Sequence, residues 1–248
     1  MTVLILGGTA EARELALLLS ARGVPFVSSL AGRVARPRLP VGDVRIGGFG
    51  GVEGLACHLR ENGVAAVVDA THPFASGISR NAARACALEG VPLLRLERPG
   101  WEAAPGSDSW NWVGTHEEAA ATAARLGRAP FLTTGRQTLG CFLGPLAEAR
   151  AVVRVVDPPE VELPRPWTLL RSRGPYTLDG ERELLRRYGC DVLVTKDSGG
   201  GHTWPKMLAA GELGLAVVVV RRESRTAGVD VVGDHVAAGG WLAERGLA

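Results

Sequence analysis

Five basic side chains follow predicted strands in the second half of this 248-residue chain, a placement suited to binding an anion. They are Arg136, Arg171, Arg173, Lys196 and Lys206. The two lysines are the only ones in the chain, and they flank three consecutive glycines in 195-TKDSGGGHTWPK-206. Because loops that follow parallel strands gather at one edge of a sheet, we expect a basic rim that attracts a multiply anionic ligand. The alternative is a solvated turn with two surface lysines.

A glycine-rich turn, 7-GGTAEAR-13, follows an apolar run and opens a helical pattern. Dinucleotide-binding folds place pyrophosphate at such a turn, because glycines let the backbone approach and helix N-terminal amides favour an anion. Gly7, Gly8, Thr9 and Glu11 are therefore candidate cofactor residues, and Thr9 also suits a helix cap. The sequence departs from G-x-G-x-x-G, so a tight turn without a ligand remains an equal alternative.

The end of the second predicted strand, 28-SSLAGR-33, bears on the choice of cofactor. NAD-specific folds usually carry an acidic residue here for the ribose hydroxyls. This chain has serines followed by Arg33, and a guanidinium suits a 2′-phosphate. The pattern favours NADP over NAD, unless Arg33 is a plain surface residue.

The stretch 47-GGFGG-51 places four glycines around an aromatic residue before a helical pattern. Glycines permit a close approach of the backbone to a ligand. Gly48, Phe49 and Gly50 are therefore candidates for packing beside an adenine, and an ordinary loop is an equal alternative.

The stretch 69-DATHPFA-75 ends the fourth predicted strand of the first half. Ligands of open α/β sheets bind outside the carboxyl ends of the strands. A rigid, polar turn containing Thr71 and His72 would suit the reactive end of a cofactor there. The alternative is a structural histidine in a strand-end loop.

These turns require strands and helices to position them, and the apolar periodicity supplies both. Strands are predicted at 2–6, 25–30, 43–48, 65–70, 92–97, 130–134, 151–156, 168–172, 191–195 and 215–220. Helices are predicted at 10–23, 52–63, 75–90, 116–126, 137–149, 178–188, 203–212 and 234–245. This alternation predicts an α/β protein with parallel sheets.

The stretch 98-RPGWEAAPGSDSWNW-112 has no clear period and is a candidate crossover between domains. We expect two small doubly wound, Rossmann-like domains with a cleft between them. Residues 1–100 would form the cofactor domain and 113–248 the substrate domain. A strand from one half could complete the sheet of the other.

Composition excludes several classes of protein. The net charge is +2 and no basic stripe with interleaved aromatics occurs, so a nucleic-acid partner is not expected. Apolar runs such as 215-LAVVVV-220 are too short to cross a membrane. The four cysteines are scattered, without Cys-x-x-Cys or a histidine at ligand spacing, so neither a metal site nor a disulfide framework is expected. Unpaired thiols suit a reducing cytoplasm.

Taken together, the ordered motifs resemble the precorrin-6A reductase family of corrin-ring, or cobalamin, biosynthesis. The resemblance covers nearly the whole chain. It rests on GGTAEAR at 7–13, AGR at 31–33, DATHPFA at 69–75, TTGRQTL at 133–139 and TKDSGG at 195–200. It implies an NADPH-dependent reductase that gives a hydride to one carbon of a macrocycle double bond and a proton to its neighbour.

The resemblance also implies roles for particular residues. Gly7, Gly8, Thr9 and Arg33 would hold NADPH, and the turn at 69–75 would lie near its nicotinamide. The substrate would be a corrin-type macrocycle with many carboxylates, which fits the basic rim.

The stretch 195–206 would then be a substrate loop. Ser198 and Gly199 would bind beside Lys196 and Lys206, and Asp197 would orient Lys196 or relay a proton.

His72 is the other candidate for proton transfer, because imidazole titrates near neutrality. Water or a substrate carboxylate is an alternative donor.

Two other functions fit parts of the pattern. A non-catalytic NADP-binding sensor would need no basic rim. A two-domain nucleotide-sugar transferase would often use a metal-binding acidic pair, and no Asp-x-Asp occurs. We expect a monomer, because no long apolar helix face marks an interface. The sequence does not decide whether the substrate ring contains cobalt.

Overall fold

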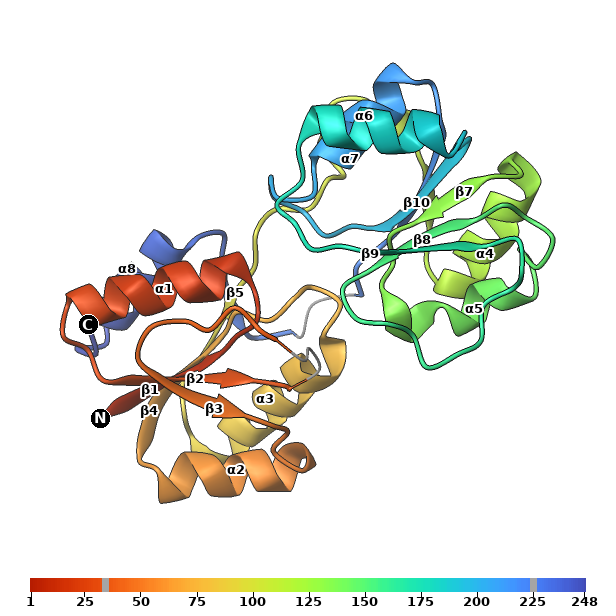
Figure 1. Ribbon diagram of the computed structural model, residues 1–248. Helices are drawn as coiled ribbons and strands as arrows, with labels where there is room; N and C mark the ends of the chain where they lie inside the picture. The colour runs from red at the N-terminus through yellow and green to blue at the C-terminus, as the bar shows by residue number, and fades with distance from the viewer. Residues whose placement is uncertain (33–35, 224–226) are drawn as a thin grey trace. The chain divides into compact units, whose positions relative to one another are not determined.

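The computed structural model describes residues 1–32, 36–223 and 227–248. The chain divides into two compact units, residues 1–99 with 224–248, and residues 100–223. Each unit contains one six-stranded parallel sheet with helices on its faces (Figure 1). The predicted α/β class with two doubly wound units is therefore confirmed.

The first unit has the strand order β12-β5-β4-β1-β2-β3. Its strands are β1 (Thr2–Leu6), β2 (Phe26–Leu30), β3 (Asp43–Ile46), β4 (Val64–Asp69), β5 (Leu93–Leu96) and β12 (Asp230–Val232). Its helices are α1 (Ala10–Ala21), α2 (Gly51–Glu61), α3 (Ser76–Glu89) and α8 (His235–Ala243). The order reverses between β1 and β4, which makes that point of the carboxyl edge the expected ligand site of a doubly wound sheet.

The second unit repeats this order with β6-β11-β10-β7-β8-β9. Its strands are β6 (Asn111–Val113), β7 (Pro130–Leu132), β8 (Val152–Val155), β9 (Thr168–Arg171), β10 (Val192–Lys196) and β11 (Ala216–Val220). Its helices are α4 (His116–Leu126), α5 (Gly140–Leu143), α6 (Leu178–Arg187) and α7 (Pro205–Glu212), with short 3-10 turns at Ser107–Ser109 and Arg136–Thr138. The order reverses between β7 and β10.

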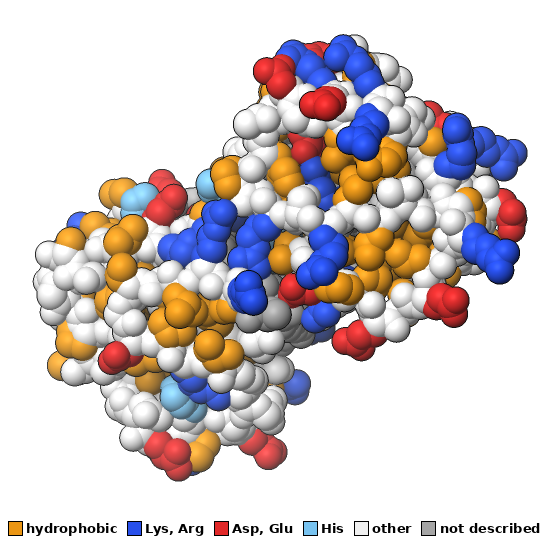
Figure 2. Space-filling view, viewed as in Figure 1, with side chains coloured by type: hydrophobic (Ala, Val, Ile, Leu, Met, Phe, Trp, Pro, Cys, Tyr) orange, Lys and Arg blue, Asp and Glu red, His pale blue; other side chains and the backbone are white. Residues whose placement is uncertain are grey.

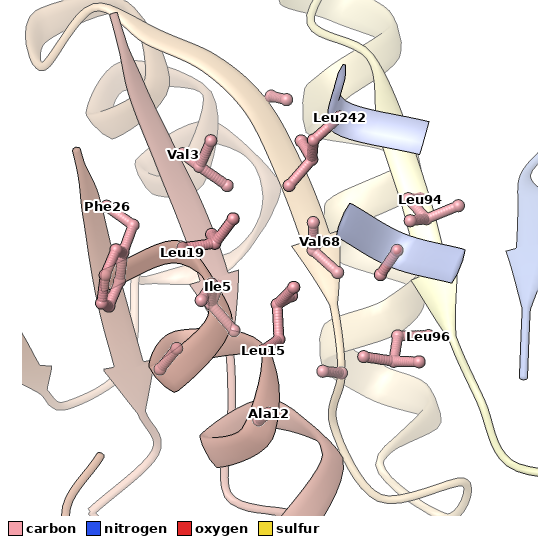
Figure 3. Packing of buried hydrophobic residues seen from close by; sticks show 14 of the residues in the cluster. Val3, Ile5, Ala12, Leu15, Leu19, Phe26, Val68, Leu94, Leu96 and Leu242 are labelled. Atoms are coloured by element: carbon pink, nitrogen blue, oxygen red, sulfur yellow. The ribbon is translucent and has the colours of Figure 1, made fainter. Parts of the chain in front are cut away.

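The central strands form because their apolar side chains are buried on both faces of the sheet, as is usual for parallel strands. In the first unit, Val3 and Ile5 of β1 face α1 and α8, where they pack with Leu15 and Leu242 (Figure 3). Leu4 and Leu6 belong to the cluster that α2 and α3 cover on the opposite face. The alternation along β1 therefore requires helices on both sides of the sheet.

Two short edge strands were missed, and they change the domain boundaries. β6 lies at the end of the stretch predicted to be a crossover, and β12 pairs in parallel with β5 of the first sheet. The last part of the chain thus belongs to the first unit, so the predicted domain of 113–248 is wrong at both ends. Strand β12 completes the sheet of the other half, the arrangement that the sequence left open.

The long helix predicted at 137–149 is also wrong. The structure has a 3-10 turn and the four-residue α5 there, followed by turns. Gly140, Gly144 and Pro145 lie within this stretch, and such residues weaken or end helices. In the part of the chain that the structure describes, no helix has the length and apolarity to cross a membrane.

Candidate functional site

The turn after β1 lies at the point where the strand order of the first unit reverses. Gly8 has φ +115°, a conformation that favours glycine. Thr9 is the N-cap of α1, and its hydroxyl accepts a hydrogen bond from the Ala12 amide at 3.2 Å. The same hydroxyl donates to the Ala70 carbonyl at 2.7 Å. The predicted cap is confirmed, and Thr9 also ties the turn after β1 to the turn after β4.

Glu11, a predicted cofactor residue, is engaged elsewhere in the same unit. Its carboxylate forms an ion pair with Arg98 at 2.8 Å, and both side chains are largely buried. An acidic side chain in the first turn of a helix also interacts favourably with the helix dipole and stabilises the helix. The ion pair therefore joins α1 to the chain just after β5, a structural role for Glu11 that the sequence did not indicate.

The end of β2 buries its two serines. Ser28 and Ser29 are 2% and 6% exposed, and Ser29 Oγ accepts a long hydrogen bond of 3.4 Å from Arg45. Ser28 Oγ has no hydrogen-bond partner within the described ranges. Arg33, the predicted 2′-phosphate contact, lies outside the residues that the structure describes.

The glycine turn after β3 is held by Arg45, a residue that the sequence analysis missed. Its guanidinium donates to the carbonyls of Gly47 and Gly48, each at 2.7 Å, and stacks 3.9 Å from the centre of the Phe49 ring. Gly50 has φ +80°. The turn predicted to lie beside an adenine thus has a fixed shape, with an aromatic ring and a cation together. Only the position of Arg45 two residues before the glycines could have indicated this.

The turn after β4 carries Thr71 and His72. Thr71 is buried, and its hydroxyl donates to Asp69 Oδ1 at 2.7 Å. His72 Nδ1 accepts a hydrogen bond of 3.2 Å from the Phe74 amide. Since Nδ1 is an acceptor there, the neutral imidazole carries its proton on Nε2. The turn is therefore rigid and polar, as predicted, with its histidine in one tautomer.

In the second unit, the reversal point lies between β7 and β10, and both lysines are there. Lys206 is 3% exposed, in the first turn of α7, and its Nζ donates to Thr133 Oγ1 at 3.0 Å. Burial, and to a lesser extent the nearby Arg154 cation, lowers the pKa of Lys206 to about 7. Burial also lowers the pKa of Lys196 to about 8. Lys206 is thus a buried helix residue and not part of a mobile loop.

The turn after β7 and the start of α4 lie near Lys196. A Cβ at Gly135 would lie 3.8 Å from Lys196 Nζ. Burial lowers the pKa of His116, and Lys196 lowers it further. Thr134 is 1% exposed, and its hydroxyl lacks a hydrogen-bond partner among the described residues. Desolvated cations are suited to a carboxylate ligand.

The arginines of the predicted basic rim are more widely spaced. Arg136 donates to the Pro158 carbonyl at 3.1 Å. Arg171 and Arg173 are exposed at the end of β9, an edge strand two places from β7, which is a separation of about 10 Å at the usual strand spacing. Arg171 also lines a cavity of about 300 Å³ with residues of α6. Figure 2 shows further basic side chains over α6, next to acidic ones.

The sequence also missed a buried ion pair of the second unit. Arg154 on β8 pairs with Glu181 on α6 at 2.5 Å, and the Arg154 guanidinium stacks 3.8 Å from the centre of the Tyr176 ring. The one sequence feature that indicates this pair is a charged residue, Arg154, inside the apolar run 151–156.

Asp197 fastens the first residues of the second unit. Its Oδ1 accepts a hydrogen bond from the Trp101 amide at 2.9 Å, and its Oδ2 lies 3.2 Å from Arg222 Nε. A Cβ at Gly100 would come within 2.5 Å of Oδ2. Asp197 is 4% exposed. Its contacts are those of a buried structural carboxylate.

We predict that Asp197→Asn lowers the free energy of unfolding of the second unit by about 1–3 kcal/mol, the cost of a weakened charged hydrogen bond. The measurement is urea unfolding followed by tryptophan fluorescence. Stability within about 0.5 kcal/mol of the wild type, together with lost turnover, would instead support the proton-relay hypothesis.

The chain resembles proteins of one family over its whole length. A family model described as "Precorrin-6x reductase CbiJ/CobK" matches residues 2–240. The precorrin-6A reductase of Rhodococcus erythropolis is 48% identical over 241 residues, 97% of this chain and 96% of that protein. The one of Mycobacterium tuberculosis strain H37Rv is 48% identical over 242 residues, 97% of each chain.

A solved structure agrees with these relatives. It is titled "CobK precorrin-6A reductase", is 40% identical, and superposes with a TM-score of 0.93 over 100% of this chain and 98% of that one. The resemblance drawn from the five motifs is therefore confirmed by the family model, by full-length relatives and by the fold. This chain belongs to the precorrin-6x reductase family.

Proposed function

We propose that this protein reduces one double bond of precorrin-6A, in cobalamin biosynthesis, with NADPH as the hydride donor. Its family and its full-length relatives carry the reductase activity in their names. The observation that carries the cofactor assignment is the meeting of two turns, 7–9 and 70–73, where the strand order of the first unit reverses. A reductase accounts for both this site and the lysine site, whereas a sensor or a nucleotide-sugar transferase does not.

Similarity favours a cobalt-free substrate. The relatives named precorrin-6A reductase are 42% to 48% identical to this chain. Those named cobalt-precorrin-6A reductase are 31% to 35% identical. We therefore assign precorrin-6A, and not its cobalt complex, as the substrate.

The cofactor would be held by the first unit. Gly7 and Gly8 leave room for pyrophosphate at the N-terminus of α1, and Thr9 fixes that turn. Arg33 would bind the 2′-phosphate. The turn of Gly48, Phe49 and Gly50, which Arg45 holds in place and which we call the pinned turn, would pack against the adenine.

The substrate would be held by the second unit. Lys196 and Lys206 would bind carboxylates of the macrocycle, because desolvated cations gain most from a charged acceptor. Ser198 and Gly199 would contribute from the same strand end. Arg136, Arg171 and Arg173, which the structure spaces more widely, would contact carboxylates elsewhere on a large ring.

Bound NADPH would supply the hydride. The chain's own residues have to orient the cofactor and the macrocycle and to provide a proton for the macrocycle. His72 in the tautomer with a proton on Nε2 is a hydrogen-bond donor at the turn that would lie near the nicotinamide. In its protonated, imidazolium form it is our candidate to deliver a proton to the ring carbon next to the one that takes the hydride, which leaves the neutral imidazole for solvent to protonate again.

A titration with NADPH and with NADH, followed by nicotinamide fluorescence, tests the cofactor assignment. We expect tight binding of NADPH and weak binding of NADH. Arg33→Ala is expected to raise the Kd for NADPH about tenfold, the value of a charge-assisted contact, and to leave the Kd for NADH unchanged. Equal losses for both cofactors would show that Arg33 does not contact the 2′-phosphate.

A further inference from the structure

Arg95 is a buried cation at the carboxyl end of β5, and it joins several polar groups of the first unit. It is 8% exposed as a residue. Its Nη1 lies 2.8 Å from Asp69 Oδ1, and its Nη2 lies 2.9 Å from Glu97 Oε2. Its Nε also donates to Glu97, at 3.1 Å. One guanidinium thus bridges the ends of two neighbouring strands.

The same guanidinium contacts the turn after β4. Its Nη1 donates to Thr71 Oγ1 at 3.1 Å and to Ser79 Oγ of α3 at 3.4 Å. Thr71 in turn donates to Asp69 through both its amide, at 3.1 Å, and its hydroxyl, at 2.7 Å. Since the only hydroxyl proton of Thr71 goes to Asp69, Thr71 supports the turn and is not a hydrogen-bond donor to a ligand.

The network continues into the cofactor turn. The Ala70 carbonyl accepts the hydroxyl proton of Thr9 at 2.7 Å, so Ala70 is bonded to the N-cap of α1. His72 follows Thr71 directly. The residue proposed to face the nicotinamide therefore sits on a turn that is fixed by Arg95 from one side and by the cofactor turn from the other.

Folding alone does not explain a buried guanidinium between two carboxylates. Removing charges from water is costly, and apolar residues usually serve stability equally well. Leu94 and Leu96, on either side of Arg95 in sequence, already fill the core on the other face of β5. The charges lie only at the strand end that meets the turn, where precise placement of a reacting group is worth more than packing.

We propose that Arg95, with Asp69 and Glu97, is a positioning residue that sets the conformation of the turn carrying His72 for hydride and proton transfer. This inference rests on the proposed reductase function. It names residues outside the cofactor and substrate contacts described above.

The test measures the rate of one turnover, because that rate does not depend on the fraction of enzyme that is folded. Excess enzyme is mixed with NADPH and precorrin-6A, and nicotinamide absorbance is followed. Arg95→Met and Thr71→Val are expected to slow this step about 10- to 100-fold, the effect of a misplaced reacting group. The Kd for NADPH is expected to change less than about threefold. Thr71→Val keeps the shape of the side chain, so its single-turnover rate tests the positioning role even if Arg95→Met does not fold.

Leu94→Ala is the matched control, since it weakens the same strand without touching the turn. It is expected to lower Tm and to keep the single-turnover rate. An unchanged rate in Thr71→Val and in folded Arg95→Met, with an active wild type, would overturn the positioning role alone. A wild type that does not oxidise NADPH with precorrin-6A would overturn the proposed function as well.

Discussion

Lys206→Met is expected to stabilise the second unit at pH 7 and, at the same time, to weaken its binding of precorrin-6A. The wild type buries the ammonium completely enough to lower its pKa from 10.5 to about 7. Methionine has a similar length and no charge to desolvate. We expect a gain of a few kcal/mol, because full linkage between these pKa values would amount to about 4 kcal/mol at pH 7. The apparent KM for precorrin-6A is expected to rise about 10- to 100-fold.

The pH dependence gives this prediction its sign. Between pH 7 and 10.5 the unfolded chain binds a proton at Lys206 that the folded chain has released, so the stability of the wild type rises with pH. Between pH 7 and 8.5 the rise from this residue is on the order of 1–2 kcal/mol. Lys196, whose pKa is lowered to about 8, adds a smaller rise. Between pH 9.0 and about 12 the buried thiol of Cys190 in the same unit, whose pKa burial raises to about 12, acts in the opposite direction.

Tryptophan fluorescence follows the relevant unit, since five of the six tryptophans lie in residues 100–223. In Lys206→Met the slope of stability against pH from 7 to 8.5 should be smaller than in the wild type. Thr133→Val is the matched control: it removes the acceptor of Lys206 Nζ and is expected to destabilise by about 1–3 kcal/mol. An unchanged slope in Lys206→Met would show that the ammonium is not desolvated. An unchanged KM would remove it from the substrate site.

Gly54→Ala is expected to lower the stability of the first unit by about 3 kcal/mol or more, the upper range for overpacking. A Cβ at Gly54 would lie 1.7 Å from the Phe49 carbonyl oxygen. Since that atom belongs to the backbone of the pinned turn, the turn has to move. Binding of NADPH should weaken with it, because the turn is proposed to pack against the adenine.

Gly240→Ala is the control in the same unit. Gly240 lies inside α8, and a Cβ there would meet no atom within 4 Å. This change is expected to stabilise by about 0.5–1 kcal/mol, because alanine favours a helix over glycine. The measurements are the Tm from thermal unfolding and the Kd for NADPH from titration, for both variants and the wild type. A Gly54→Ala protein that is as stable as the wild type and binds NADPH equally would contradict a rigid turn.

Much of the fold was predictable, because its signal is local. The buried strands β1, β4 and β11 are short apolar runs, and α1 follows its glycine turn at the expected place. The edge strands β6 and β12 were not predictable in this way. They have three residues each, and β12 is largely exposed, so their conformation comes from pairing with a strand distant in the sequence.

The candidate site was predictable as a set of turns, but not as a set of contacts. Strand ends located Thr9, His72 and Lys196 after β1, β4 and β10, and the strand order, which the sequence did not supply, puts these turns at the two reversal points. The burial of Lys206 depends on α7 beginning at Pro205, which turns the side chain toward Thr133. The bonds of Arg95 join residues up to 26 positions apart, and no spacing rule anticipates such a network.

Hydride transfer from NADPH to the macrocycle can be followed by supplying precorrin-6A with NADPH that carries deuterium at the transferable position of C4, and by measuring the mass of the product. We expect that the macrocycle gains one deuterium from the cofactor and one hydrogen from solvent, while NADPH is oxidised in equal amount. NADH is expected to give a far slower reduction. A product without deuterium, or no oxidation of NADPH with authentic precorrin-6A, would contradict the assignment of this chain as an NADPH-dependent reductase.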